Sequence, residues 1–218
     1  MNHFSHSAWH AIPLDLNDYF SPELLPYLKQ LEFSPNEIIF HINEKPASLL
    51  LLCKGTAKKY ISQANAKMPL VQLLQAPDYI GALEFVGAQQ TSEEIRAVTT
   101  CHCLEIPLEK CRRQLLADTA FLRQLCCMLG KRNAETTETY AYNQTYPLEN
   151  RLARFILHHL HGDLYTARQM DAAEYLGTSY RHLLHVMAHF IEQGILKKTP
   201  YGYAVTNSAL LQELAERT

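Results

Sequence analysis

The stretch from Thr166 to Val205 constrains the fold of this chain more than any other part of the sequence. Its apolar spacing predicts two short helices, and Gly177 between them permits the positive φ of a sharp turn. Thr166 and Ser179 are placed to cap the first and the second helix. Ala173 is small enough to let the two helices approach closely where they cross. The pattern predicts a helix-turn-helix.

Both predicted helices are amphipathic. The apolar positions of the first helix are Met170, Ala173 and Leu176, and those of the second, which share one face, are Leu183, Val186, Met187, Phe190 and Ile191. Gln193-Gly194 is expected to end the second helix. A two-stranded wing should follow, with strands over 195–198 and 203–205 around a turn at Thr199-Pro200-Tyr201-Gly202.

The opposite face of the second helix favours DNA binding over an ordinary helical hairpin. Its hydroxyl, guanidinium and imidazole groups form the hydrogen bonds that read base edges or hold phosphates. They belong to Ser179, Tyr180, Arg181, His182 and His185. Because a wing follows in the expected place, we predict a winged helix-turn-helix that binds DNA.

The sequence upstream of this region predicts a small β-domain. Residues 1–20 are expected to pack on it as an extension, and Ser21-Pro22-Glu23 should open a short helix through Leu31. Between Glu32 and Pro107, short apolar runs alternate with turn residues, as in a small antiparallel barrel or roll. The expected strands are Glu37–His41, Leu49–Lys54, Thr56–Gln63, Met68–Leu74, Glu94–Thr99 and His102–Pro107.

Helices are expected to connect the two regions. A short one over Leu108–Ala117 precedes a long one that Asp118 caps and Tyr146-Pro147 ends. The long helix carries an apolar stripe with Leu125, Met128 and Leu129. Self-association as a parallel pair would bury this stripe, and packing on the chain's own roll is the alternative. The remaining helices are expected from Leu148 to near His161-Gly162 and from Ser208 to Arg217, the last one capped by Asn207.

Composition limits the partners and the compartment. The net charge is −2, so positive potential must be local to the motif and come from Arg168, Arg181, Lys197 and Lys198. No apolar run approaches the ~20 residues of a membrane span, and the N-terminus lacks the pattern of a signal peptide. We expect a cytoplasmic protein without a membrane partner, whose six cysteines are reduced at rest.

The order of roll, long helix and winged helix-turn-helix resembles the CRP/FNR-type bacterial transcription regulators over almost the whole chain, and among them the YeiL branch. In the roll, Gly81-Ala82-Leu83 stands where the family has Gly-Glu-Leu in its phosphate-binding cassette, and Arg96-Ala97 and 104–107 match the strands that follow. The resemblance implies an α+β fold in three parts. These are an effector-type β-roll over 1–117, a connecting and dimerisation helix over 118–146 and a winged helix-turn-helix over 147–218.

The resemblance further implies a homodimeric activator or repressor that binds a palindromic operator in double-stranded DNA. RNA polymerase would be a further partner of an activator. The recognition helix, 179–192, would enter a major groove, with half-sites about one helical turn apart. Tyr180, Arg181 and His185 fall at base-contacting positions of the family. Residues placed to hold phosphates are Thr166, Gln169, Thr178, Lys197, Lys198 and Tyr201.

Two of these positions depart from the family pattern. The family often has Glu where Arg181 stands and Arg where His185 stands, so the operator cannot be copied from other members. Arg181 is the strongest candidate base reader because its fork bonds guanine at two atoms, a contact that discriminates between bases by about 1–3 kcal/mol.

The cassette also departs from the family pattern. Cyclic-nucleotide binders of the family use its Glu for the ribose and a following Arg-Ser or Arg-Thr for the cyclic phosphate. Here Ala82 replaces the Glu, and Thr91-Ser92 followed by two glutamates stands where the Arg is expected. Because a phosphate would meet carboxylates, we predict that a cyclic nucleotide does not control this chain. The degenerate effector pocket would comprise Gly81, Ala82, Leu83, Thr91, Ser92 and Arg96.

Five of the six cysteines lie close together in the sequence, at Cys101, Cys103, Cys111, Cys126 and Cys127. The family's oxygen sensors hold an iron–sulfur cluster on N-terminal cysteines, but no cysteine precedes Cys53 in this sequence. Two interpretations stay open. The cysteines are buried apolar residues, or they make the chain a redox- or metal-responsive regulator through an iron–sulfur cluster or a redox-active disulfide.

The sequence argues against an enzyme. The strands of the roll offer His41 and His102 without the His-x-His pair of metal-binding cupins, and neither a Gly-rich nucleotide loop nor a Gly-x-Ser-x-Gly elbow occurs in the sequence. The remaining histidines are expected to face DNA or solvent rather than to bind a metal: His158, His159, His161, His182, His185 and His189.

Overall fold

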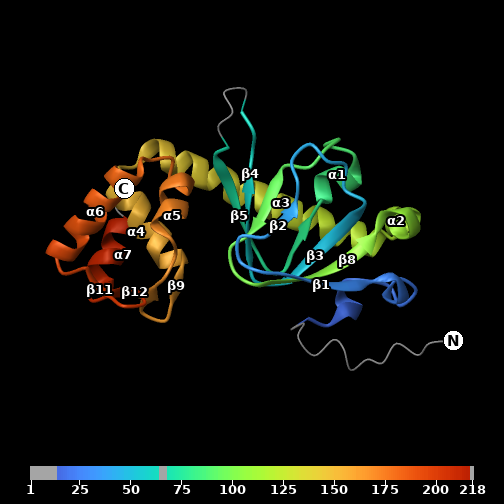
Figure 1. The fold of residues 1–218 in the computed structure, drawn as a ribbon, viewed down its shortest axis with the longest axis horizontal. Helices are drawn as coiled ribbons and strands as arrows, with labels where there is room; N and C mark the ends of the chain where they lie inside the picture. The colour runs from blue at the N-terminus through green and yellow to red at the C-terminus, as the bar shows by residue number, and fades with distance from the viewer. Residues whose placement is uncertain (1–13, 64–67, 217–218) are drawn as a thin grey trace. The chain divides into compact units, whose positions relative to one another are not determined.

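The computed structural model describes residues 14–63 and 68–216, and Figure 1 shows its α+β fold. The chain divides into two compact units, with the boundary between Ala134 and Glu135. This boundary lies inside the longest helix, the segment that the sequence assigns to the connection between domains. The predicted combination of antiparallel β-structure, long helix and C-terminal helical region is confirmed.

Unit 1 is a β-roll of two four-stranded antiparallel sheets. The first sheet contains, in order, β1 (Lys29–Phe33), β8 (Cys101–Pro107), β3 (Ser48–Lys54) and β6 (Asp78–Ile80). The second contains β2 (Ile38–Phe40), β7 (Glu94–Ala97), β4 (Thr56–Tyr60) and β5 (Leu70–Gln75). All six predicted strands are present, with ends shifted by a few residues.

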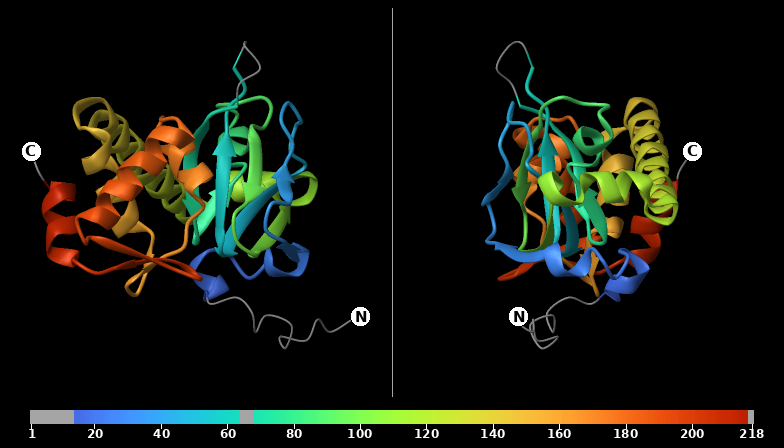
Figure 2. Two further views of the ribbon diagram at one scale, coloured as in Figure 1. Left: turned by 60° about the vertical axis from the view of Figure 1, so that its left-hand side comes forward. Right: turned by 90° about the vertical axis from the view of Figure 1, so that its right-hand side faces the viewer.

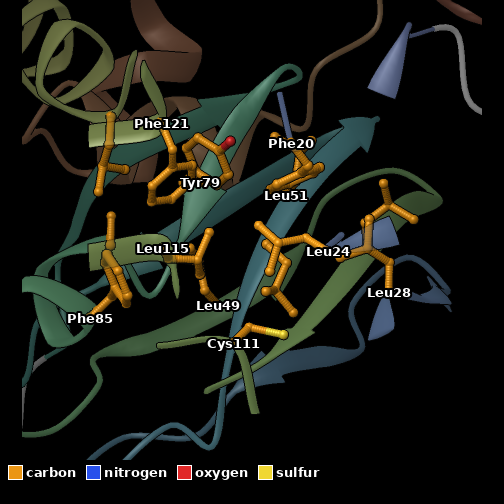
Figure 3. Close-up of a cluster of buried hydrophobic side chains, with 14 of the residues drawn as sticks. Phe20, Leu24, Leu28, Leu49, Leu51, Tyr79, Phe85, Cys111, Leu115 and Phe121 are labelled. Carbon is orange, nitrogen blue, oxygen red and sulfur yellow. The ribbon is translucent and has the colours of Figure 1, made fainter. Parts of the chain in front are cut away.

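The continuous apolar run in β3 explains how the roll is held together. Alternate side chains of a strand point to opposite faces, and in β3 both faces are buried. Leu49 and Leu51 enter one core cluster, whereas Leu50 and Leu52 enter a second. Figure 3 shows the first cluster, in which Leu49 and Leu51 lie near aromatic side chains.

The helix predicted from Ser21 to Leu31 is wrong. The structure has only a 3-10 turn there, η3 (Leu25–Tyr27), followed by β1. Pro26 lacks the N–H that an α-helix would use at its position, and β1 gains backbone partners from β8, with Leu31 opposite Cys103. Of the expected N-terminal extension, residues 1–13 lie outside the described residues; η2 (Leu16–Asp18) precedes Phe20, which is buried in the core.

Two short helices and the start of a long one complete unit 1. The first, α1 (Ala82–Val86), lies between two predicted strands, where the sequence predicts no helix, and α2 (Leu108–Ala117) has the predicted bounds. The long helix α3 (Thr119–Thr145) begins in unit 1, where the Asp118 carboxylate accepts hydrogen bonds from the backbone N–H groups of Ala120 and Phe121, both at 3.0 Å. Asp118 is therefore the predicted cap.

The first part of α3 packs on its own roll. Phe121 contacts the rings of Phe20, Tyr79 and Phe85 with centroid separations of 5.6–6.4 Å (Figure 3). One turn later, Leu125 is 1% exposed, so the prediction that it lies on a free stripe is wrong. The alternative of packing within the chain holds for this residue because the roll presents an apolar face to α3. Met128 and Leu129 are only partly buried at the edge of that cluster.

Unit 2 contains the end of α3 and four further helices. These are α4 (Leu148–His158), α5 (Gln169–Tyr175), α6 (Tyr180–Glu192) and α7 (Ser208–Glu216). Asn207 caps α7 as predicted, because its side-chain oxygen accepts from the Leu210 N–H at 3.0 Å. Arg217, the expected end of this helix, lies outside the described residues. The α4 side chain of Asn150 donates to the carbonyl of Leu214 on α7 at 2.9 Å.

The wing is larger than predicted. Strands β11 (Leu196–Thr199) and β12 (Gly202–Val205) form the expected hairpin, but β10 (Leu164–Tyr165) and β9 (Leu160–His161) extend it to a four-stranded sheet. Two predictions fail for this reason: α4 ends at His158 rather than near Gly162, and Thr166 follows a strand instead of capping α5. The residue at the cap position of α5 is Arg168, whose side chain forms no cap bond.

Candidate functional site

The first candidate site is the exposed face of α6. Ser179 caps this helix as predicted, because its Oγ accepts from the His182 N–H at 3.2 Å. The buried face comprises Leu183, Val186, Met187 and Phe190, each at most 2% exposed. Ile191 was expected on this face but is 38% exposed, since its position lies at the edge of the apolar stripe. Met170 of α5 is likewise exposed.

The turn before α6 fixes the direction of that helix. Gly177 has φ +62°, the left-handed conformation that the sequence predicts. The Thr178 N–H donates to the Ala173 carbonyl at 2.9 Å, which closes the end of α5. From α4, the Arg151 guanidinium donates to the Leu176 carbonyl at 2.7 Å. Ala173 is 3% exposed between the helices, so the helix-turn-helix has the predicted small residue at its core.

The remaining face of α6 points away from the body of unit 2. The five predicted base-contacting residues are all exposed: Ser179, Tyr180, Arg181, His182 and His185. One turn after Tyr180 lies Leu184, which is 37% exposed and was not singled out from the sequence. The sequence contains a signal for the exposure of Leu184, because the helical spacing that places Leu183 in the core places Leu184 outside it.

The predicted phosphate-contacting residues occupy three places in unit 2. Lys197 and Lys198 are exposed on β11, and Tyr201, 81% exposed, lies at the tip of the hairpin drawn in red in Figure 2. The tip is ordered by Thr199, whose hydroxyl accepts from the Tyr201 N–H and donates to the Gly202 carbonyl. The other three positions follow β10, begin α5 and precede α6: Thr166, Gln169 and Thr178.

The second candidate site is the cassette of the roll. Gly81 has φ +89°, and a Cβ there would lie 2.9 Å from the Phe40 ring, so the position requires glycine. The next residue, Ala82, is 2% exposed and belongs to the apolar cluster of Leu49 and Phe85. Leu83 is partly buried on α1. The cassette is thus packed into the core at its second residue.

The polar candidates of the cassette are engaged by their own chain. The Ser92 hydroxyl is buried and lies 2.5 Å from the His41 carbonyl and 3.0 Å from the Glu44 carbonyl. The Arg96 guanidinium pairs with Glu94 at 2.7 Å. Thr91 is exposed beside Ser92. The structure therefore holds Ser92 and Arg96 in bonds that stabilise the roll.

A charged group beside the cassette was missed by the sequence reasoning. Arg132 on α3 pairs with Asp78 of β6 and donates to the Tyr79 carbonyl at 2.8 Å. Burial lowers the pKa of Lys59, and burial raises the pKa of Glu84, the residue after Gly81-Ala82-Leu83; each carries a charge that opposes the other's shift. No local sequence pattern links these residues, because the roll brings them together from three distant segments.

The cysteines separate into two classes. Cys53, Cys101, Cys103 and Cys111 are buried, whereas Cys126 and Cys127 are exposed on α3, and none of the six forms a disulfide. Burial raises the pKa of Cys53 to about 12 and that of Cys101 to about 11. Within residues 14–63 and 68–216, no group of three or more His, Cys, Asp or Glu side chains is arranged to hold a metal ion.

Comparison with known proteins identifies the family of this chain. Residues 30–118 match the model of the cyclic nucleotide-binding domain family. The chain is 38% identical to the regulatory protein YeiL of Escherichia coli O157:H7 over 198 residues, which cover 91% of this chain and 90% of YeiL. The chain belongs to the CRP/FNR family of transcriptional regulators. It is also 25% identical to the cAMP-activated global transcriptional regulator CRP of E. coli O157:H7 over 65% of this chain and 64% of CRP.

Solved structures of CRP/FNR regulators share the fold. A regulator of this family from Eubacterium rectale superposes with a TM-score of 0.76 at 17% identity, covering 93% of this chain and 98% of that one. One from Thermus thermophilus gives 0.73 at 16% identity, covering 86% and 98%. As a CRP/FNR member, the chain is a transcriptional regulator. Among the described residues, no helix has the length and apolar character needed to cross a membrane.

Proposed function

We propose that this CRP/FNR regulator is a homodimer that reads a palindromic DNA operator by placing α6 in the major groove. The observation that carries the proposal is the division of α6 into two faces. One face is buried in unit 2, and the other exposes Tyr180, Arg181 and His185 behind a cap at Ser179. An α-helix fits the major groove, and these side chains match the groups on base edges.

The wing supplies the contacts that position such a helix. Lys197, Lys198 and Tyr201 project from one hairpin of the unit that carries α6. Phosphate contacts of this kind fix the register of the protein on the duplex without reading its sequence. Thr166, Gln169 and Thr178 are candidates for the same role from the start of α5 and the turn before α6.

Dimerisation through α3 is part of the proposal. The helix is 27 residues long, about 40 Å at 1.5 Å per residue. Because Leu125 packs on the roll, the contact between copies rests on Met128, Leu129 and the exposed positions beyond them. Sedimentation of the purified chain tests this step, and twice the mass of one chain is expected.

Control by a cyclic nucleotide is not part of the proposal. Ala82 occupies a core position, and the nearby Arg96 is paired with a carboxylate of its own strand. A bound cyclic phosphate would have to break the pair and approach two glutamates. Addition of cAMP is therefore expected to leave the DNA affinity of this chain unchanged.

Selection from random DNA by the full-length chain tests the proposed function. A palindromic consensus is expected, with two half-sites spaced by about one helical turn. Arg181→Ala should then lower the affinity for the consensus by about 1–3 kcal/mol and relax the preference at one base pair. Arg123→Ala on α3, far along the chain from α6, is a matched control that should retain the preference. An unchanged preference in Arg181→Ala would remove Arg181 as a base reader.

A redox-responsive version of this function rests on Cys126 and Cys127, because they are the exposed thiols. Raised pKa values keep Cys53 and Cys101 in the unreactive thiol form near neutral pH. A disulfide reagent at pH 8 is therefore expected to modify two of the six cysteines rapidly in the folded chain. If oxidation alters DNA affinity, the double variant Cys126→Ser/Cys127→Ser should be insensitive. Iron and sulfide bound to anaerobically purified chain would instead favour a cluster.

A further inference from the structure

One side chain on the exposed face of α6 does not fit a purely polar surface. Leu184 is 37% exposed, and Tyr180, one turn before it, is 45% exposed. Apart from Ile191, which is 38% exposed near the end of the helix, the other leucine, methionine, valine and phenylalanine residues of α6 are at most 2% exposed. A single exposed apolar side chain is ordinary on a protein surface, and Leu184 is distinguished by its place beside Arg181 and His185.

The position of Leu184 relative to the base readers is set by helix geometry. It follows Tyr180 by four residues and Arg181 by three, so all three lie on neighbouring parts of one face. His185 is the next residue and is also exposed. If Arg181 reaches base edges, Leu184 faces the same groove a little less than one helical turn away, a rise of ~4.5 Å.

The major groove contains one methyl group that such a side chain can contact. Thymine carries a C5-methyl group there, whereas other base-edge groups are hydrogen-bond donors and acceptors. Leucine forms no hydrogen bonds, and placing it against a donor or acceptor would leave that group unpaired. A thymine methyl group is therefore the complementary partner of Leu184.

We propose that Leu184 is a specificity-determining residue that reads the C5-methyl group of a thymine. The thymine lies within roughly two base pairs of the base that Arg181 contacts, since one helical turn spans about that length of duplex. This inference rests on the proposed function. It adds a sequence preference that hydrogen bonding alone does not provide.

Replacement of thymine by uracil in the selected operator tests the inference, because uracil lacks only the methyl group. Each thymine of the half-site is replaced in turn, and the affinity of the full-length chain is measured. At one position, methyl removal is expected to weaken wild-type binding by about fourfold, the value for one buried methyl-sized group. Leu184→Ala should bind the thymine and uracil operators equally.

A matched variant separates this role from a general effect on the helix. Ile191→Ala removes a side chain of similar exposure, 38%, two turns further along α6. It should keep the fourfold response to uracil, and melting curves should show that both variants are folded. A methyl response that persists in Leu184→Ala, or that wild type lacks at every thymine, would overturn the inference while the selected operator still supports the proposed function. Failure of wild type to select any operator would overturn both.

Discussion

The predicted recognition helix α6 and the cassette of the roll are both recognisable in the sequence, yet the polar side chains of α6 are exposed and several residues of the cassette are buried or bonded within the chain. On α6, the polar residues Arg181 and His185 are exposed, and the helix owes its place to its other face. In the roll, Ala82 is packed in the core and Ser92 is bonded to backbone carbonyls. The polar surface of α6 is therefore available to a partner. In the roll, Ala82 and Ser92 stabilise the fold instead.

The largest effect that distinguishes the two regions is expected from Ala82→Glu. This change restores the residue of the family cassette, but it places a carboxylate at a 2% exposed position among apolar side chains. We expect the free energy of unfolding to fall by on the order of 3 kcal/mol or more, without gain of cAMP binding. Urea unfolding followed by circular dichroism measures the loss. Leu83→Glu, at the partly buried neighbour, is the control and should cost less.

The opposite result would be informative. An Ala82→Glu chain that keeps the stability of the parent and binds cAMP would mean that the cassette retains the family's pocket. The contrast between the two regions would then reduce to a single substitution.

A smaller loss is expected from Arg132→Ala. The change removes the guanidinium that pairs with Asp78 and bonds the Tyr79 carbonyl, so it takes one positive charge away from a largely buried carboxylate. We expect a cost of about 2 kcal/mol, below the 3–5 kcal/mol of fully buried pairs because both groups keep some contact with water. Arg96→Ala, which breaks a more exposed pair with Glu94, should cost less than about 1 kcal/mol.

Hydrogen exchange locates the effect of Arg132→Ala. The amides of Tyr79 and Ile80 on β6 should exchange faster, whereas those of α6 in unit 2 should be unaffected. Equal acceleration in both units would mean that the two units unfold as one, and the roll and the recognition helix would then not be independent.

Local signals in the sequence predict the turn and the second helix of the helix-turn-helix, whereas the cap at Thr166 that they predict for the first helix is wrong. The boundaries of the turn and the second helix depend on neighbouring residues, namely the cap at Ser179, the positive φ at Gly177 and the end at Gln193-Gly194. The exposed face of α6 followed from the same periodicity. Ile191 and Met170 were misplaced because each lies at the margin of an apolar stripe, where period alone does not decide burial.

Long-range pairing explains what the sequence did not reveal. Strand β1 exists because it pairs with β8, the last strand of the roll in chain order, and β6 pairs with β3. Leu125 had the spacing of a dimer stripe, but the aromatic cluster around Phe121 draws that face of α3 onto the roll. The contact between Arg132 and Asp78 depends on the same docking. The assignment of residues to base and phosphate contacts remains a prediction.

The smallest effect, on DNA affinity, is expected from the removal of one exposed positive charge in unit 2. Lys197→Ala removes an exposed cation from β11, on the hairpin that we expect to contact phosphates. Affinity should fall to a similar extent on the selected operator and on unrelated DNA, and the slope of log K against log salt should decrease by about 1. Lys29→Ala in β1 of unit 1, an exposed lysine 3.8 Å from Glu105, is the matched control and should leave the slope unchanged. A loss confined to the operator would instead assign Lys197 to base reading, because a phosphate contact weakens binding to every sequence alike, and the wing would then read bases together with α6.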